Sequence, residues 1–119
     1  MALALSSTGF QDAVDYKVIQ CTGINVTTAQ TNVANSSGAL HSVIIDSANS
    51  SDNVSLHILD TADTSETQIA FKGKASSIKT FVIPGGYAFT ELKFWVSKLS
   101  MATDTTAFAG SVDVTLVCS

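Results

Sequence analysis

Two apolar runs separated by a polar segment stand out in the middle of the chain, between Gly38 and Asp60. The first run, 40–45, is apolar on both faces, as in the central strand of a sheet. The second run alternates between two faces: Val54, Leu56 and Ile58 on one, Ser55 and His57 on the other. Because successive side chains of a strand point to opposite sides of the sheet, this run predicts a strand with one buried face. The polar segment is rich in turn-forming Asp, Ser and Asn, so the whole stretch predicts a β-hairpin.

The rest of the chain repeats this pattern of short alternating segments. Gly23 is expected to produce a bulge or bend, and Pro84 with the two glycines after it is expected to end a strand. Turn signals recur at sandwich-like spacing, and no segment keeps a helical period. The pattern predicts an all-β fold, an antiparallel β-sandwich of about seven to eight strands. Besides the two runs above, strands are predicted at 16–28, 66–72, 77–83, 92–98 and 112–118.

The alternation within the predicted strands also predicts a core. Large apolar residues on the inward faces of a two-sheet sandwich should lose most of their solvent contact. The residues expected to be largely buried are Ile44, Leu56, Ile58, Phe71, Phe94 and Val114.

The 119 residues are enough for one domain with a core and too few for two. We assign residues 16–119 to the sandwich and residues 1–15 to an N-terminal arm. The arm shows no lasting period, so it is either a frayed terminus or a segment laid on a neighbouring subunit, anchored by Leu3, Leu5 and Phe10. Its short apolar stretch lacks the basic start of a signal peptide, which predicts synthesis in the cytoplasm.

Charge argues against one class of partner, and the length of the apolar runs argues against another. The chain carries a net charge of −4, and its six basic residues are dispersed lysines with no arginine among them. Binding to phosphates requires clustered positive charge, so nucleic acid is not expected as a partner. No apolar run approaches the length of a membrane helix, so no membrane is expected either. A surface rich in Ser and Thr instead suits contact with other proteins, because few charges must be desolvated.

Few residues suggest catalysis or metal binding. His41 and His57 are placed on the two strands of the predicted hairpin, where they are interpreted as cross-strand surface residues; a metal site would need more converging ligands. Cys21 and Cys118 fit no metal-ligand spacing and are expected to be free thiols, although a bridge becomes possible if the first and last strands pair. No serine lies in a nucleophile elbow. The prediction is a protein that is not an enzyme and that has no catalytic residue, metal or cofactor.

Two aromatic residues remain as candidates for binding. Trp95 falls on the polar side of its predicted strand, beside lysine, and Tyr87 lies near the Pro84 turn. Trp95 has three interpretations that stay open: stacking on a sugar, burial against another subunit, or cover by a loop of its own chain. The first makes the protein a carbohydrate-binding β-sandwich module, on a phage fibre or a secreted protein. The second places Tyr87 and Trp95 at an interface together with Leu3, Leu5 and Phe10 of the arm.

Three stretches of sequence resemble small β-sandwich proteins of tailed-phage virions, of the capsid decoration or cement type. The resemblance covers roughly residues 35–119. The stretches are Ser37-x-x-Leu40 with Ile44-Ile45-Asp46-x-Ala48-Asn49 and the run Val54–Asp60; Pro84-Gly85-Gly86-Tyr87-Ala88-Phe89; and Val112 to Ser119.

This resemblance implies a specific topology, location and partner. A single jelly roll becomes the preferred topology, with an immunoglobulin-like strand order as the alternative. The protein would be located in the virion, on the capsid surface, where it binds and stabilises the shell. The major capsid protein of a phage would be one partner. The second partner would be the protein itself, as a homo-oligomer and most simply a trimer, because unpaired strand edges need cover and the capsid lattice has three-fold positions.

Overall fold

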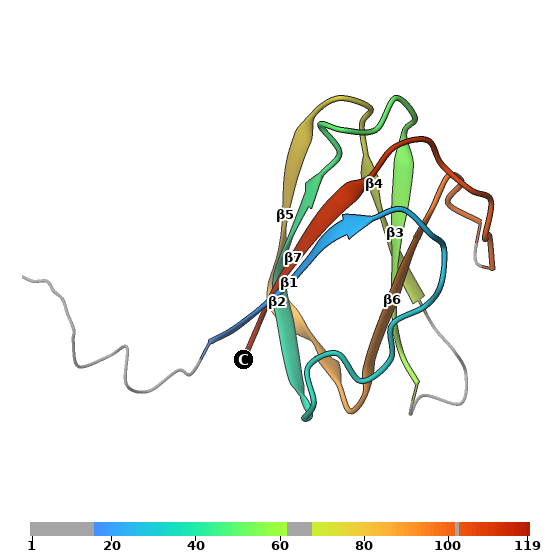
Figure 1. Cartoon of the computed structure of the whole chain (residues 1–119). Helices are drawn as coiled ribbons and strands as arrows, with labels where there is room; N and C mark the ends of the chain where they lie inside the picture. The colour runs from blue at the N-terminus through green and yellow to red at the C-terminus, as the bar shows by residue number, and fades with distance from the viewer. Residues whose placement is uncertain (1–15, 62–67, 102) are drawn as a thin grey trace, which may run out of the picture.

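The computed structural model describes residues 16–61, 68–101 and 103–119, which form two antiparallel sheets packed face to face (Figure 1). Sheet A has the strand order β1-β7-β2-β5, and sheet B has the order β4-β3-β6. The predicted all-β antiparallel sandwich is confirmed, and the described residues contain no helix. The strands are β1 (Lys17–Ile24), β2 (Gly38–Asp46), β3 (Val54–Asp60), β4 (Gln68–Gly73), β5 (Ile78–Phe89), β6 (Leu92–Ser97) and β7 (Val112–Cys118).

The predicted hairpin between β2 and β3 is wrong. β2 pairs with β5 and β7 in sheet A, whereas β3 pairs with β4 and β6 in sheet B. The segment between them therefore crosses from one sheet to the other. The buried Ser47 anchors this crossing, because its hydroxyl donates to the carbonyl oxygens of Lys74 (2.6 Å) and Ser77 (3.0 Å). Alternation shows which side of a strand is buried, but it does not show which strand pairs with which.

The first and last strands do pair, as a bridge between the two cysteines would require. Cys21 lies opposite Val114, however, and Cys118 lies opposite Lys17. This offset of four residues amounts to about 13 Å along the strand, whereas the Cα atoms of a disulfide lie within about 7 Å of each other. Both cysteines are free thiols. The prediction of free cysteines is confirmed.

Gly23 occupies the predicted bulge. The register of β1 against β7 shifts between Cys21 and Ile24, and Gly23 has a φ of +65°, a conformation that glycine adopts without steric cost. The Gly23 N–H donates to Asp113 Oδ1 at 2.7 Å. This bulge turns the end of β1 away from sheet A and toward sheet B.

Pro84 does not end its strand, contrary to the prediction. β5 continues to Phe89. Residues 83–86 bulge out of the strand opposite His41, between the Leu40–Tyr87 and Ser42–Val82 pairs. Proline has no N–H to donate, but β5 is the edge strand of sheet A and the bulge needs no ladder bond there.

The core lies between the sheets and is built by alternation. β7 alternates strictly between buried and partly buried residues, as predicted. Of the residues expected in the core, Leu56, Ile58, Phe94 and Val114 are buried, which confirms the prediction for these four. The prediction for Ile44 and Phe71 is wrong, because both are only partly buried. Phe71 instead packs on Phe81 at the side of the sandwich, with ring centroids 5.2 Å apart.

The position of Ile44 follows from a bulge in β2. Leu40 lies opposite Cys118 and Ser42 opposite Val117, so His41 has no partner in β7. One extra residue reverses the direction of every side chain after it. Val43 therefore points into the core, where it is fully buried, and Ile44 points to the outside of sheet A.

The jelly-roll topology remains a prediction. A jelly roll has eight strands, and the described residues form sheets of four and three. At the free edge of β6, Gln30 forms an isolated antiparallel bridge with Phe94. The Gln30 N–H donates to the Phe94 carbonyl at 2.8 Å, and the Phe94 N–H donates to the Gln30 carbonyl at 3.0 Å. The segment between β1 and β2 thus lies along sheet B without forming a full strand.

Candidate interaction site

The outer face of sheet B is buried beneath the chain itself along β3 and most of β6, whereas Ala70 and Lys72 of β4 are exposed on it. Six of the seven residues of β3 are buried, so the side predicted to face solvent is covered as well. The cover is formed by the segment between β6 and β7, in which Asp104 and Phe108 are also buried. The interpretation of His57 as a surface residue is therefore wrong: its exposed fraction is 0%. His41 lies in sheet A, so the two histidines are not cross-strand neighbours.

His57 and Trp95 form the centre of this covered face. They are paired across β3 and β6, and their rings stack with centroids 4.5 Å apart at 6°. His57 Nε2 lies 2.7 Å from Ser97 Oγ and 3.1 Å from the Leu99 carbonyl oxygen. The Ser97 hydroxyl itself donates to that carbonyl at 2.9 Å. This serine–histidine contact is fully buried, so it joins the loop to the sheet and has no access to a substrate.

Trp95 is covered by a loop of its own chain, the third of the interpretations given above. Its exposed fraction is 7%, and the indole Nε1–H donates to the Asp104 carbonyl at 2.8 Å. Lys93 Nζ lies 5.7 Å from the ring centroid, within the range of a cation–π contact. A ring that is held in this way presents little surface to a sugar or to a second subunit.

Asp104 holds the covering loop in place through its side chain as well. Its Oδ1 accepts from Thr106 Oγ1 at 2.6 Å, and its Oδ2 accepts from the Leu99 N–H at 2.9 Å. These hydrogen bonds, the one from Thr106 above all, lower the pKa of Asp104 from 3.8 to about 2. The loop over Trp95 is thus secured by a carboxylate that must stay ionised.

We expect the substitution Asp104→Asn to remove part of the pH dependence of stability between about pH 4 and pH 2. A carboxylate whose pKa is lower in the folded than in the unfolded chain binds fewer protons when folded. It therefore stabilises the fold above the unfolded pKa of roughly 3.9, and this stability is lost as the pH falls toward 2.

The measurement is denaturant unfolding at a series of acid pH values. Unfolding is monitored through the fluorescence of Trp95, the single tryptophan of the chain. The other carboxyl groups titrate in both proteins, so the difference between parent and variant reports Asp104. Equal pH dependence in the two proteins would show that Asp104 does not hold the loop.

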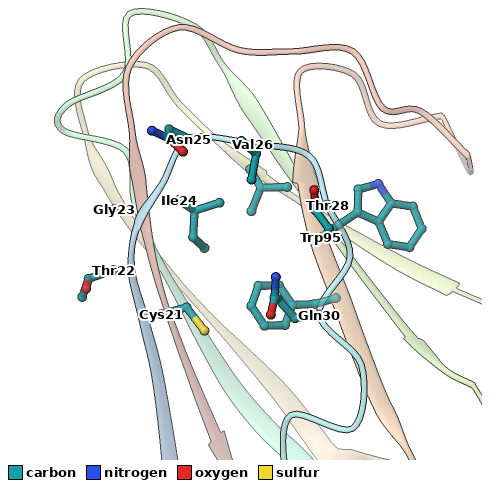
Figure 2. A pocket seen from close by; sticks show the side chains of 11 residues that line it. Cys21, Thr22, Gly23, Ile24, Asn25, Val26, Thr28, Gln30 and Trp95 are labelled. Carbon is teal, nitrogen blue, oxygen red and sulfur yellow. The ribbon is translucent and has the colours of Figure 1, made fainter.

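Two hollows lie beside Trp95. The larger, about 310 Å³, opens between the end of β1 and β6 (Figure 2). The smaller, about 220 Å³, is a shallow depression on the outer side of β6, lined by Trp95, Lys93, Ala29 and three threonines. In Figure 2 the indole of Trp95 is directed away from the larger hollow, while the thiol of Cys21 lies on its wall.

The outer face of sheet A, in contrast, is uncovered by the described part of the chain and is almost uncharged. It presents two cross-strand rows, and neither row holds a charged residue; Asp113 and Asp46 follow in the next row. Val18 and Val82 at the two ends of the first row are 58% and 73% exposed. The first row is Val18, Val117, Ser42 and Val82, and the second is Gln20, Thr115, Ile44 and Thr80.

The remaining predicted interface residues are Tyr87 and three residues of the N-terminal arm. Tyr87 is partly buried and packs against the core, opposite Leu40. Leu3, Leu5 and Phe10 lie outside the described residues. Val18 and Val82 were not among the surface residues predicted from the sequence. The signal for both was present, because each alternates with inward residues of its strand.

Two further kinds of feature are absent from the described ranges. No helix there is long and apolar enough to span a membrane. Within the same ranges, no three His, Cys, Asp or Glu residues are placed to hold a metal ion.

Comparisons with known proteins give only distant likenesses in structure. No protein-family model matches the chain. No curated protein matches it either. The Drosophila NLP core, solved for its pentamer formation and histone binding, is 9% identical with a TM-score of 0.46, over 89% of this chain and 97% of that one.

Two other solved structures share this level of similarity. A family 32 carbohydrate-binding module of C. perfringens NanJ, solved with galactose, is 10% identical with a TM-score of 0.40, over 86% and 93% of the two chains. A mutant of the 3,4-ketoisomerase QdtA from Thermoanaerobacterium thermosaccharolyticum is 11% identical with a TM-score of 0.38, over 87% of this chain and 58% of that one. Likenesses this distant carry no argument about ligand or activity.

Proposed function

We propose that this protein is a capsid decoration protein, which binds the outer surface of a phage capsid as a homo-oligomer and stabilises the shell. The observation that carries the proposal is the outer face of sheet A, whose two cross-strand rows hold no charged residue. A flat face of valine, isoleucine, serine and threonine can be covered by another protein without desolvating charges. The resemblance of residues 35–119 to virion proteins supplies the class of partner.

The way such a protein acts follows from mass action. A protein that binds the assembled lattice more strongly than it binds free capsid subunits shifts the equilibrium toward the assembled state. An oligomer contacts several capsid subunits at once, so modest single contacts suffice because each further contact is intramolecular. The net charge of −4 favours the outside of the shell over an interior filled with DNA.

We expect purified protein to bind undecorated shells of the cognate phage saturably and to raise their melting temperature. The substitution Val82→Lys should weaken this binding by about tenfold or more. A lysine buried without a partner in the interface costs more than the 1.4 kcal/mol that corresponds to a tenfold change in affinity. Occupancy of the shells, measured across a concentration series, checks the prediction.

The matched control for this experiment is Ala70→Lys. Ala70 is also exposed on a strand, but it lies on β4 and therefore in the opposite sheet. It should bind like the parent protein. A second comparison uses protein that lacks residues 1–15. If neither the full chain nor the shortened chain binds the shells, the proposed function is wrong.

A carbohydrate-binding module is the second candidate function, and the shallow hollow on the outer side of β6 favours it. An indole edge, the Lys93 amine and threonine hydroxyls are groups that bind sugars, and all of them line this hollow. Sugar binding would retain the protein on a polysaccharide column, and Thr103→Ala and Lys93→Ala would abolish the retention. A decoration protein passes through the column unchanged.

A further inference from the structure

The larger hollow is a gap where the chain separates from a strand edge. Gln30 is hydrogen-bonded to Phe94 at one end of the hollow, but no backbone hydrogen bond joins Val96 to residues 25–30 of the described chain. N–H and C=O groups on alternate residues of a strand point to the same edge, so those of Val96 point the same way as those of Phe94, into the gap. The Val96 N–H and C=O therefore have no backbone partner on that side within the described chain, and they lie at the bottom of the hollow, because Val96 is only 1% exposed.

The wall of this hollow has a definite chemistry. Ile24, Val26, Phe94 and Val96 supply apolar surface, and the polar side chains that line it are hydroxyls, amides and the Cys21 thiol. None of the described residues that line it is charged. A backbone donor and acceptor beside uncharged walls fits an extended, uncharged peptide that adds to the strand edge and places apolar side chains in the gap.

We propose that this hollow binds the N-terminal segment of a second copy of the chain, through the repeat Ala2-Leu3-Ala4-Leu5. Residues 1–11 contain no charged side chain, which matches the uncharged wall. Small and large apolar residues alternate in the repeat, so Leu3 and Leu5 share one side of an extended segment and the alanines take the other. The proposal gives the apolar residues of the arm a binding role.

The position of the hollow favours a second copy over the chain's own arm. The arm joins β1 at Lys17, and the hollow lies at the other end of β1, around Cys21 to Ile24 (Figure 2). Fifteen extended residues span at most about 50 Å, which is enough to reach a neighbouring molecule. To return to its own hollow, the arm would have to reverse just before β1, and no glycine or proline lies between Gly9 and Tyr16 to form that turn.

Cys21 makes the test direct, because its thiol lies on the wall of the hollow and the thiol of Cys118 is buried in the core. Two full-length proteins are mixed under oxidised glutathione: one carries Leu5→Cys with Cys21→Ser, and the other is unchanged. Binding of the arm by a second copy predicts a covalent heterodimer, which a size tag on the unchanged protein separates on a non-reducing gel from a dimer of two Leu5→Cys chains. Replacing the unchanged protein by an equally tagged Cys21→Ser protein should abolish the heterodimer.

Two glutamate variants of the unchanged partner check that the link forms in the hollow. Val26→Glu places a charge at a residue that lines the hollow and is 56% exposed, and should eliminate the link. Gln20→Glu, at an exposed residue of β1 that does not line the hollow, should leave it intact. An equal link with both variants would overturn the proposal.

Two other outcomes would also overturn it. The first is an intramolecular bridge in a single chain that carries Leu5→Cys together with Cys21, without any covalent dimer. The second is no bridge of either kind. The proposal rests on the self-association in the proposed function, whereas shell binding depends on the outer face of sheet A. If the cross-link does not form but the shells are decorated normally, this inference alone is refuted. If the cross-link forms but the shells are not decorated, the shell-binding role alone is refuted.

Discussion

Ile58→Ala should lower the free energy of unfolding by about 2–5 kcal/mol. Ile58 lies in the central strand of sheet B, between Ile69 and Phe94 in the neighbouring strands, and its exposed fraction is 0%. Removing its outer carbons loses buried apolar surface and leaves a cavity that the strands on either side cannot close. Denaturant unfolding, with the midpoint and slope both measured, gives the change directly.

Ile44→Ala is the matched control for this substitution. It removes the same atoms from a residue that sequence alternation had placed in the core and that the structure places on the outer face of sheet A, partly exposed. Its cost should be about 1 kcal/mol or less, because less surface is lost and no closed cavity forms. Equal losses in the two variants would mean that the face assignment of β2 or of β3 is incorrect.

Gly110→Ala should be the most damaging backbone substitution in the loop before β7. Gly110 has a φ of +80°, and a Cβ atom added there would lie 2.0 Å from the Asn49 carbonyl oxygen. That oxygen accepts a hydrogen bond from the Ser111 N–H at 3.3 Å, so the loop cannot move away without breaking the contact. The crossing segment between the two sheets is held at this point.

Gly85→Ala isolates the steric part of that effect. Gly85 has nearly the same φ, +79°, but nothing lies within 4 Å of an added Cβ. Its substitution should cost only the left-handed backbone penalty of about 1–2 kcal/mol. Gly110→Ala should cost about 1–3 kcal/mol more, the usual cost of forcing extra atoms into packed structure. Thermal unfolding of both variants checks this, and equal losses would contradict the close contact with Asn49.

The two proposed surfaces use different parts of the fold and fail independently. The outer face of sheet A offers area without charge, which suits a flat contact with a shell. The hollow beside Val96 offers a strand edge, which suits a single extended segment. If both proposals hold, the arm joins the copies to each other and leaves the outer face free for the capsid.

Local alternation was sufficient to predict the fold class and most of the strands. The period of two along Val112–Cys118 depends only on the geometry of an extended chain, so its buried face follows from the residue types. The bend at Gly23 was also predictable, because only glycine adopts that conformation without steric cost. These features are encoded within a few residues of where they occur.

The tertiary structure decided which strands pair and what covers them. β2 and β3 are apolar enough to pair with each other, yet each finds its partners in a different sheet. The bulge at His41 then reverses the faces of β2, so that Val43 is buried where alternation from Leu40 indicates Ile44. His57 and Trp95 look like surface residues because their strands alternate, but the loop held by Asp104 covers them. A pattern along the chain records which positions are polar, and only contacts between distant residues determine whether a polar position meets solvent or a hydrogen-bonding partner within the same chain.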